Sequence, residues 1–263
     1  MITQNIDRIV TRKEFEGQKD LFVTSIFRTL QGEGPYAGYP AVFVRFAGCN
    51  YGNKDPEGAC AWCDTAFQID QAHQYTVDEL CAEVNNLEGL RPTDVLVITG
   101  GEPTLQPLLV DFIKAIASGF SAVQLESNGT QAYFYDQAVG IRQVIHPVPL
   151  SLVVSPKANE KAGRYGQLSR TVLGNADCLK FVVSADPTSA HHTLPDWAFS
   201  HSNVYVSPMA VYKRAYTGEV SSIWDTDLID AKATSANYAY AAQYAMKFGL
   251  KLSVQTHLFT AIP

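Results

Sequence analysis

The chain has 263 residues, 46% of them hydrophobic, which is enough apolar material for one large α/β domain or two small ones. Its formal charge is −6, and no run of Lys or Arg resembles a patch that follows phosphates, so we expect no direct nucleic-acid partner. The first residues form no apolar signal segment, and no apolar stretch approaches the roughly 20 residues that span a bilayer. We therefore expect a small-molecule ligand, no membrane partner and a cytoplasmic location.

Short β-branched or aromatic runs recur along the chain and predict strands. They cover residues 21–27, 41–46, 94–99, 122–127, 151–156, 178–183, 203–208 and 251–255. Helical patterns lie between several of them, at 76–87, 105–118 and 226–249. Thr76 is the expected N-cap of the first helix and Gly249 the expected C-cap of the last.

This alternation of strands and helices predicts an α/β fold with a mostly parallel sheet. Because about six to eight strands are accompanied by too few helices for a complete (β/α)8 repeat, we expect a partial TIM-like barrel. The barrel should form one domain over residues 1–263. Residues 158–176 and 185–202 have weaker patterns, and we expect them to form long surface excursions.

Four predicted strands run directly into small, polar or glycine-rich residues. The residues at these ends are Gly100, Gly101 and Glu102; Ser127, Asn128 and Gly129; Pro156 and Lys157; Pro208 and Met209. Catalytic residues in parallel α/β folds collect where the strands end. The sequence therefore predicts a cofactor site at one rim of the barrel.

Three of the five cysteines lie close together, in a C-x10-C-x2-C pattern formed by Cys49, Cys60 and Cys63. In a reducing compartment, clustered thiols indicate metal ligands or catalysts more than disulfides. Three thiolates bind three irons of a [4Fe-4S] cluster and leave the fourth iron open to another ligand. A structural zinc site is the alternative, but it needs a fourth ligand, which His73 or Cys81 could supply.

The cysteine pattern followed by "GGEP" at residues 100–103 resembles the radical S-adenosylmethionine (SAM) superfamily. Further motifs, in the same order along almost the whole chain, resemble the 7-carboxy-7-deazaguanine synthase family. These are "TLQGEG" (29–34), "CDT" (63–65), "ESNGT" (126–130), "SPK" (155–157), "KFVV" (180–183), "SPM" (207–209) and "QTH" (255–257). A lone GGEP can be a simple β-turn, but its order after the cysteines makes the resemblance specific.

The resemblance implies a radical SAM carbon-nitrogen lyase with a [4Fe-4S] cluster, SAM and Mg2+. Its reaction would convert 6-carboxy-5,6,7,8-tetrahydropterin into 7-carboxy-7-deazaguanine with release of ammonia, a step in 7-deazapurine (queuosine precursor) biosynthesis. It also implies a one-electron donor such as flavodoxin, and a homodimer. Two other functions remain open: a radical SAM activase acting on another substrate, which would share the cluster and GGEP, and a zinc-binding module.

The resemblance also assigns cofactor residues. The glycines Gly100 and Gly101 would leave backbone groups open to the methionyl amine of SAM, and Glu102 would place a negative charge near it. Ribose and carboxylate contacts are implied for Ser127, Asn128, Ser155 and Lys157. Thr65 corresponds to the Mg2+ position, since oxygen ligands suit a hard cation. Simpler roles are helix capping for Thr65 and a turn for Asn128.

The substrate residues implied by the resemblance are Gln31, Glu33, Arg45, His257 and the α-carboxylate of Pro263. A pterin presents a guanidine-like edge that suits the carboxylate of Glu33, and its own carboxylate suits the guanidinium of Arg45. The simpler alternatives are a solvent-facing loop carboxylate and a snorkelling strand arginine. An inward arginine on an apolar strand is costly unless it is paired, which favours the binding role.

Overall fold

The computed structural model describes residues 10–51, 60, 63, 65, 67–213, 222–260 and 262. The strands are β1 (Leu21–Leu30), β2 (Pro40–Phe46), β3 (His73–Tyr75), β4 (Val95–Gly100), β5 (Ala122–Ser127), β6 (Leu150–Val154), β7 (Ala158–Asn159), β8 (Arg164–Tyr165), β9 (Cys178–Val183), β10 (Val204–Pro208) and β11 (Lys251–Leu252). The helices are α1 (Arg12–Phe15), α2 (Val77–Asn85), α3 (Leu109–Ile116), α4 (Ala132–Asp136), α5 (Ala138–Ile145), α6 (Arg170–Asn175), α7 (Ala231–Phe248) and α8 (His257–Thr260). Short 3-10 turns are η1 (Gly34–Tyr36), η2 (Ile69–Gln71), η3 (Pro103–Leu105), η4 (Ala117–Gly119) and η5 (Asp196–Ser200).

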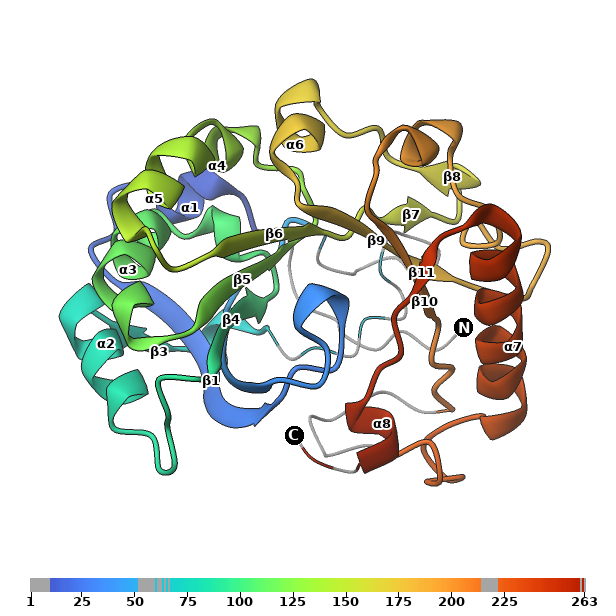
Figure 1. The fold of residues 1–263 in the computed structure, drawn as a ribbon, viewed down its shortest axis with the longest axis horizontal. Coiled ribbons are helices and arrows are strands. Elements are labelled where there is room, and N and C mark those ends of the chain that lie inside the picture. The colour runs from blue at the N-terminus through green and yellow to red at the C-terminus, as the bar shows by residue number, and fades with distance from the viewer. Residues whose placement is uncertain are drawn as a thin grey trace.

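One curved sheet dominates the described part of the chain (Figure 1). Its nine strands follow the order β11-β10-β9-β6-β5-β4-β2-β1-β3. Strands β2 through β11 along this order pair in parallel, whereas β1 and β3 add an antiparallel edge. Helices such as α2, α3, α5 and α7 lie on the outer side of the sheet (Figure 1). The prediction of a partial barrel is confirmed.

The two faces of the sheet differ in what they bury. A large apolar core lies between the sheet and its outer helices, and it includes Leu96, Ile98 and Phe112. A smaller cluster, with Val97 of β4 packed beside the partly buried Phe43 of β2, fills the inner face near the amino ends of the strands. Apolar residues on both faces explain why these parallel strands read as continuous hydrophobic runs.

The inner face becomes polar toward the carboxyl ends of the strands. Phe43 pairs with Val97, and one pleat further along the same face Arg45 pairs with Thr99. On β5, the fully buried Gln124 lies on the same face of the sheet as Glu126, which is two residues closer to the carboxyl end. The apolar cluster therefore closes the amino end of the barrel, and the polar residues gather at its carboxyl end.

Some of the predicted helix ends are confirmed and one is wrong. Thr76 caps α2 through a reciprocal capping box with Glu79, and Gly249 ends α7 in the left-handed conformation, with φ 67°; both caps are confirmed. The predicted start of the last helix at residue 226 is wrong, because α7 begins at Ala231 with Asp230 as its N-cap. Residues 225–229 instead form turns, and Ile229 bridges to Tyr212.

Residues 158–176 and 185–202 are not surface excursions, and this prediction is corrected. The first segment contributes Tyr165 and Val172 to the main core, and the second contributes Leu194 and Ala198. The ring of Tyr165 lies 5.1 Å from that of Phe181 on β9, so the first segment packs against the sheet. Short elements with one or two anchoring side chains carry too little periodicity to be recognised from sequence.

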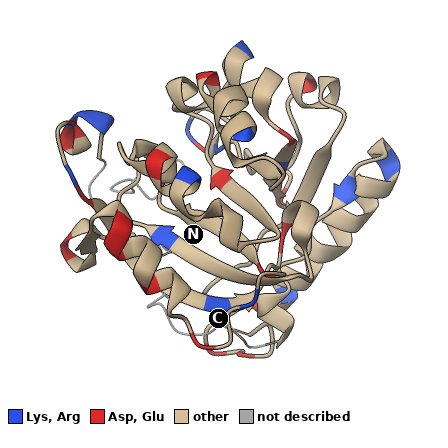
Figure 2. Cartoon of the chain, turned by 60° about the vertical axis from the view of Figure 1, so that its left-hand side comes forward, with Lys and Arg blue, Asp and Glu red and all other residues tan. Residues whose placement is uncertain are grey.

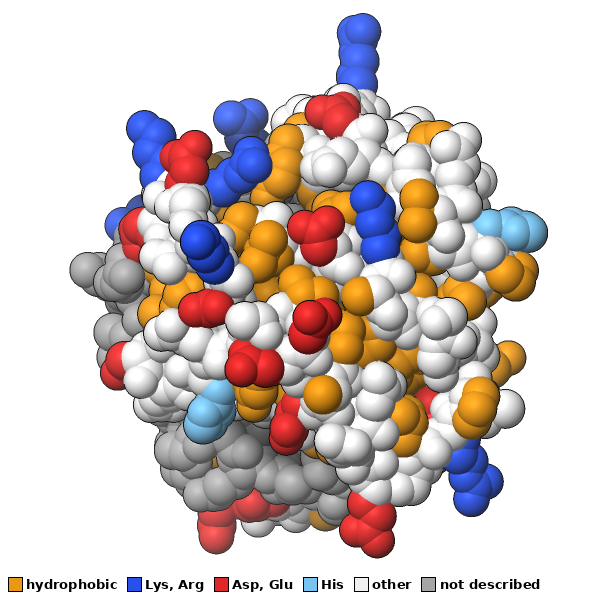
Figure 3. All heavy atoms as spheres, turned by 90° about the vertical axis from the view of Figure 1, so that its left-hand side faces the viewer, with side chains coloured by type: hydrophobic (Ala, Val, Ile, Leu, Met, Phe, Trp, Pro, Cys, Tyr) orange, Lys and Arg blue, Asp and Glu red, His pale blue; other side chains and the backbone are white. Residues whose placement is uncertain are grey.

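Charged side chains are spread over the described chain. Lys and Arg alternate with Asp and Glu along the ribbon (Figure 2). The face seen in Figure 3 carries charges of both signs among scattered hydrophobic side chains. Within the described residues, no helix is both long and apolar enough to cross a membrane.

An ion pair at the amino end of the barrel gives a testable pH dependence. Arg28 of β1 donates from Nε and a terminal nitrogen to the two oxygens of the fully buried Asp94 side chain, at 2.7 and 3.1 Å. The Arg28 hydrogen bond holds the pKa of Asp94 below its usual value. A depressed carboxyl pKa stabilises the fold above the pKa of the unfolded chain, and this contribution is lost as pH falls through the folded-state pKa.

Asp94→Asn should therefore lower the urea midpoint at pH 7, and the difference from the unsubstituted protein should shrink as the pH is lowered below about 4. Urea unfolding of both proteins at several pH values measures this. A difference that stays constant over the whole range would contradict the stabilising role of the ionised pair.

Candidate active site

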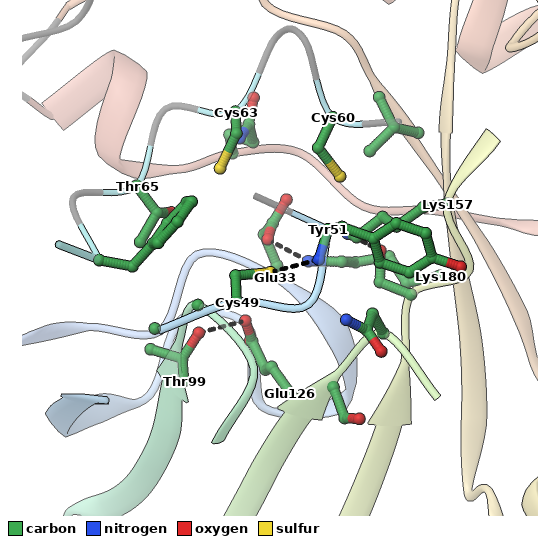
Figure 4. Close-up of a pocket in the computed structure, with 18 residues that line it drawn as sticks. Glu33, Cys49, Tyr51, Cys60, Cys63, Thr65, Thr99, Glu126, Lys157 and Lys180 are labelled. Carbon is green, nitrogen blue, oxygen red and sulfur yellow. Dashed lines mark hydrogen bonds and ion pairs between the residues drawn. The ribbon is translucent and has the colours of Figure 1, made fainter. Parts of the chain in front are cut away.

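A pocket opens at the carboxyl ends of the parallel strands (Figure 4). It contains about 920 Å³ of space between atoms, including its solvent-open mouth. Its lining residues come from the ends of β4, β5 and β6 and from the segment after β2. This is the rim at which parallel α/β folds place their small-molecule sites.

All three clustered cysteines line this pocket, and so does Thr65. In Figure 4 the side chains of Cys49, Cys60 and Cys63 point into the same space. Cys49 lies three residues after the end of β2, and its sulfur accepts a hydrogen bond from the amide of Tyr51 at 3.4 Å. The amide of Cys63 donates to the carbonyl of Cys60 at 2.9 Å, which closes a turn between these two cysteines.

The chemistry of these thiols fits a cationic group. Burial raises the pKa of the Cys49 thiol well above its usual value, and the neighbouring Cys60 raises it further. Three thiolates in one pocket repel one another, so their ionisation requires positive charge such as the irons of a cluster. In the described part of the chain, no three His, Cys, Asp or Glu side chains already form a compact set of metal ligands.

The alternative zinc site gains no fourth ligand from the two candidates named for it. His73 is exposed on the edge strand β3. Cys81 lies on α2, packed against the core on the outer side of the sheet. Neither residue lines the pocket. The three-cysteine donor set therefore fits a cluster with an open iron better than a closed zinc site.

The two glycines of GGEP allow a close approach of two backbones. A Cβ on Gly101 would lie 2.1 Å from the carbonyl oxygen of Gly48, and one on Gly100 would lie 2.2 Å from that of Phe46. Gly100 also has φ +125°, which side chains rarely adopt. The amide of Gly101 donates to Phe46 at 2.9 Å, so this N–H is used within the protein. The end of β4 thus lies directly against the backbone that leads into Cys49.

Glu102 connects the ends of two strands. Its side chain is fully buried and accepts hydrogen bonds from the Thr104 amide at 3.1 Å, the Ser127 hydroxyl at 2.8 Å and the Asn128 amide at 2.6 Å, and also from the Thr104 hydroxyl. Burial raises the pKa of Glu102, and these hydrogen bonds oppose the increase. The structure places Glu102 behind the pocket wall, where it holds the GGEP loop to the loop after β5.

The other predicted SAM residues gather at the ends of β5 and β6. Ser127, Asn128, Ser155 and Lys157 all line the pocket, together with Gly100 and Gly101. The ammonium of Lys157 donates to the Ser155 hydroxyl at 3.0 Å. Asn128 donates from Nδ2 to the side chain of Asn50 at 2.8 Å. This last contact ties the segment after Cys49 to the end of β5.

The predicted substrate residues reach the pocket to different degrees. Glu33 lines it, and the buried Gln31 donates from Nε2 to Glu126 at 3.0 Å. Arg45 lies beside Thr99 on the inner face, and its buried Nε has no hydrogen-bond partner. An unpaired guanidinium nitrogen at this position supports a role in binding an anion.

His257 begins α8 close to the loop that carries Glu33. A Cβ on Gly32 would lie 3.6 Å from Nδ1 of His257. Leu258 is fully buried and packs this short helix against a small apolar cluster. The remaining predicted substrate residue, Pro263, lies outside the described residues.

The sequence analysis missed several lining residues, among them Lys180, Glu126 and Thr99. Lys180 forms an ion pair with Glu33. Glu126 accepts from Gln124 at 2.9 Å and from Thr99 at 3.4 Å, in addition to Gln31. A signal for both charged residues was present, because each lies within an apolar strand, like Arg45. The cost of an unpaired charge in such a strand predicts a buried partner.

Comparison with known proteins identifies the family. No protein-family model matches the chain. A 7-carboxy-7-deazaguanine synthase from Rhodospirillum rubrum is 32% identical over 243 residues, covering 91% of this chain and 91% of that protein. The synthase of the same name from Hyperthermus butylicus is 37% identical over 267 residues, covering 98% of this chain and 100% of that protein. This chain belongs to the 7-carboxy-7-deazaguanine synthase family.

A further member of this family, from Rickettsia prowazekii, is 31% identical over 92% of the chain and 88% of its own length. The crystal structure of QueE from Escherichia coli has a similar fold, with a TM-score of 0.54 at 20% sequence identity. The similarity covers 94% of this chain and 99% of that one. The resemblance inferred from the sequence motifs is confirmed at the level of the family and the fold.

Proposed function

We propose that the protein converts 6-carboxy-5,6,7,8-tetrahydropterin into 7-carboxy-7-deazaguanine, releasing ammonia, as a single radical SAM domain over residues 1–263. The observation that carries this proposal is the shared pocket: the three clustered cysteines and the Lys180–Glu33 ion pair line the same cavity. Membership of the 7-carboxy-7-deazaguanine synthase family supports the reaction.

The cofactor sites follow from the pocket lining. Cys49, Cys60 and Cys63 would hold a [4Fe-4S] cluster, and Thr65 beside them would contribute oxygen to a Mg2+ site. SAM would lie along the ends of β4, β5 and β6, against the lining residues already described. When bound, the cluster and SAM together supply the one-electron chemistry that starts the reaction. The chain itself binds, orients and shields the reactants.

The charged groups that line the pocket, together with Arg45 beside it, suit the two ends of a carboxylated pterin. Glu33 and Glu126 offer carboxylate acceptors for the guanidine-like edge. Arg45, with its free buried Nε, suits the substrate carboxylate. Gln31 and His257 would complete this set, and the α-carboxylate of Pro263 is proposed as a further acceptor. Holding both ends fixes the ring relative to the cluster.

The proposal includes a one-electron donor such as flavodoxin, a homodimeric assembly and a cytoplasmic location. The radical SAM activase alternative is disfavoured by the charged residues that line the pocket, the buried Lys180 and the partly buried Glu33 and Glu126. A peptide substrate has no need for such a set of charges.

Anaerobic reconstitution with iron and sulfide tests the proposal. The unsubstituted protein should carry about four irons per chain and, with dithionite, SAM, Mg2+ and the pterin, release a product with the mass of 7-carboxy-7-deazaguanine. Cys63→Ala should lose both the cluster and the product. Cys81→Ala is the matched control and should keep both, because this thiol faces the outer core. A zinc-containing, colourless protein would contradict the proposal.

A further inference from the structure

Lys180 is a buried lysine that lines the pocket. It lies on β9 with 7% of its surface exposed, and its Nζ contacts Oε2 of Glu33 (Figure 4). The two residues are 147 positions apart in the chain. An isolated buried charge is unfavourable, and even a buried ion pair is often no more stabilising than apolar residues of similar volume. The stability of the fold alone therefore does not explain this pair.

Glu33 is held at both of its carboxylate oxygens. Oε2 contacts Lys180, and Oε1 accepts from the Ser207 hydroxyl on β10 at 3.1 Å. Its backbone amide donates to the side chain of Gln31 at 3.1 Å. Glu33 itself lies in the loop between β1 and η1, outside any strand. Its orientation is therefore set by side chains of β9 and β10 rather than by its own backbone element.

Lys180 also faces the second carboxylate of the pocket. The charge of Glu126 on β5 acts on Lys180, and Gln31 connects the Glu33 backbone to the Glu126 carboxylate by accepting from the Glu33 amide and donating to Glu126. The pocket lining thus places the ammonium of Lys180 close to two carboxylates, those of Glu33 and Glu126.

We infer that Lys180 is a positioning residue that holds the Glu33 carboxylate as a hydrogen-bond acceptor for the guanidine-like edge of the substrate, and so selects ligands that present such an edge. This inference rests on the proposed function. Lys180 acts through Glu33, and substrate affinity is the property that it controls.

The ionisation of the pair agrees with this role. Burial alone would raise the pKa of Glu33, but Lys180, followed by His257 of α8 and Ser207, lowers it overall. Burial would likewise lower the pKa of Lys180, whereas Glu33 and Glu126 raise it overall. Burial raises the pKa of the Tyr238 phenol on α7, and the charge of Glu33 raises it further. Without Lys180, the strongest influence that opposes burial is removed, so the pKa of Glu33 should rise.

Lys180→Met tests the inference through a pH profile. At pH 7 the variant should raise the KM for the pterin about tenfold or more, because Glu33 loses the cation that orients its carboxylate and favours its ionised form. Raising the pH toward 9 should restore much of the affinity as Glu33 ionises. Iron content and SAM affinity should stay unchanged, since Lys180 is assigned to the substrate. Lys180→Arg should retain most of the affinity, because it keeps a cation beside Glu33.

Two further variants separate this role from a loss of structure. Lys114→Met removes an exposed lysine of α3 and should leave every quantity unchanged. The double variant Lys180→Met with Glu33→Gln removes both buried charges, so it should fold even where the single variant does not. It should show the raised KM without any recovery at high pH.

An unchanged KM in Lys180→Met would overturn the inference. An increase that is independent of pH, or that comes with equal losses of iron and SAM affinity, would also overturn it. Failure of the proposed function gives a different result from failure of this inference alone. In that case the unsubstituted protein would neither bind nor convert the pterin, and the inference would be wrong as well.

Discussion

Substituting alanine for Gly101 is expected to prevent stable cluster assembly. The added Cβ would lie 2.1 Å from the Gly48 carbonyl oxygen and 3.1 Å from Cβ of Cys49. The first contact is backbone against backbone, so a side-chain rotation cannot relieve it. The segment leading into Cys49 must therefore move, at a cost of about 1–3 kcal/mol or more. We expect most of the cluster iron to be lost after reconstitution.

Iron and sulfide analysis of the purified variant measures this effect. The matched control is Gly140→Ala in α5, where the glycine is exposed and an added Cβ meets no atom within 4 Å. This control should keep full iron and gain up to about 1 kcal/mol of helix stability. Full iron loading in Gly101→Ala would show that the loop has more freedom than the close approach implies.

Replacing Glu102 by alanine is expected to have the largest effect on stability. The change leaves the Ser127 hydroxyl, the Asn128 amide and the Thr104 groups without their acceptor inside the protein. Each buried unsatisfied donor costs about 1–3 kcal/mol, so the total should amount to several kcal/mol. The melting temperature should fall by about 10 °C or more, and SAM binding should be lost with it, since both loops lose their connection.

Thermal unfolding and SAM titration of the same preparation measure both effects, with exposed Glu88→Ala as the neutral control. The two readouts also separate two roles for Glu102. If SAM affinity falls while the melting temperature stays unchanged, Glu102 contacts SAM directly, as the sequence motif implied. If SAM affinity and melting temperature fall together, Glu102 acts by holding the two loops together, as its buried hydrogen bonds indicate.

The sequence predicted the parts of the site that local patterns encode. The cysteine spacing and the polar residues at strand ends, such as Ser127 and Lys157, can be read within short windows. These residues line the pocket because parallel strands bring their carboxyl ends to the same rim. Arg45 was implied by the family resemblance and supported by the cost of burying a charge, and its unpaired Nε agrees with that argument.

Other features depend on contacts that no local pattern contains. The pairing of Lys180 with Glu33 requires β9 and the loop after β1 to meet, although they are far apart in the strand order. No spacing of residues in the sequence predicts this contact. The hydrogen bond from the Asn128 amide to Glu102 likewise joins residues that are far apart in the sequence, at the ends of neighbouring strands. In the fold, the core contributions of Tyr165 and Leu194 were missed because the elements that carry them are short or irregular.

A crystal structure of the anaerobically reconstituted protein with SAM, Mg2+ and the carboxypterin tests the central claim most directly. We predict one cluster on Cys49, Cys60 and Cys63, with SAM on its open iron. The guanidine-like edge of the pterin should contact Glu33 and the pterin carboxylate Arg45, in the same pocket. A four-ligand metal site that includes another protein side chain, or a pterin bound away from this pocket, would contradict the account.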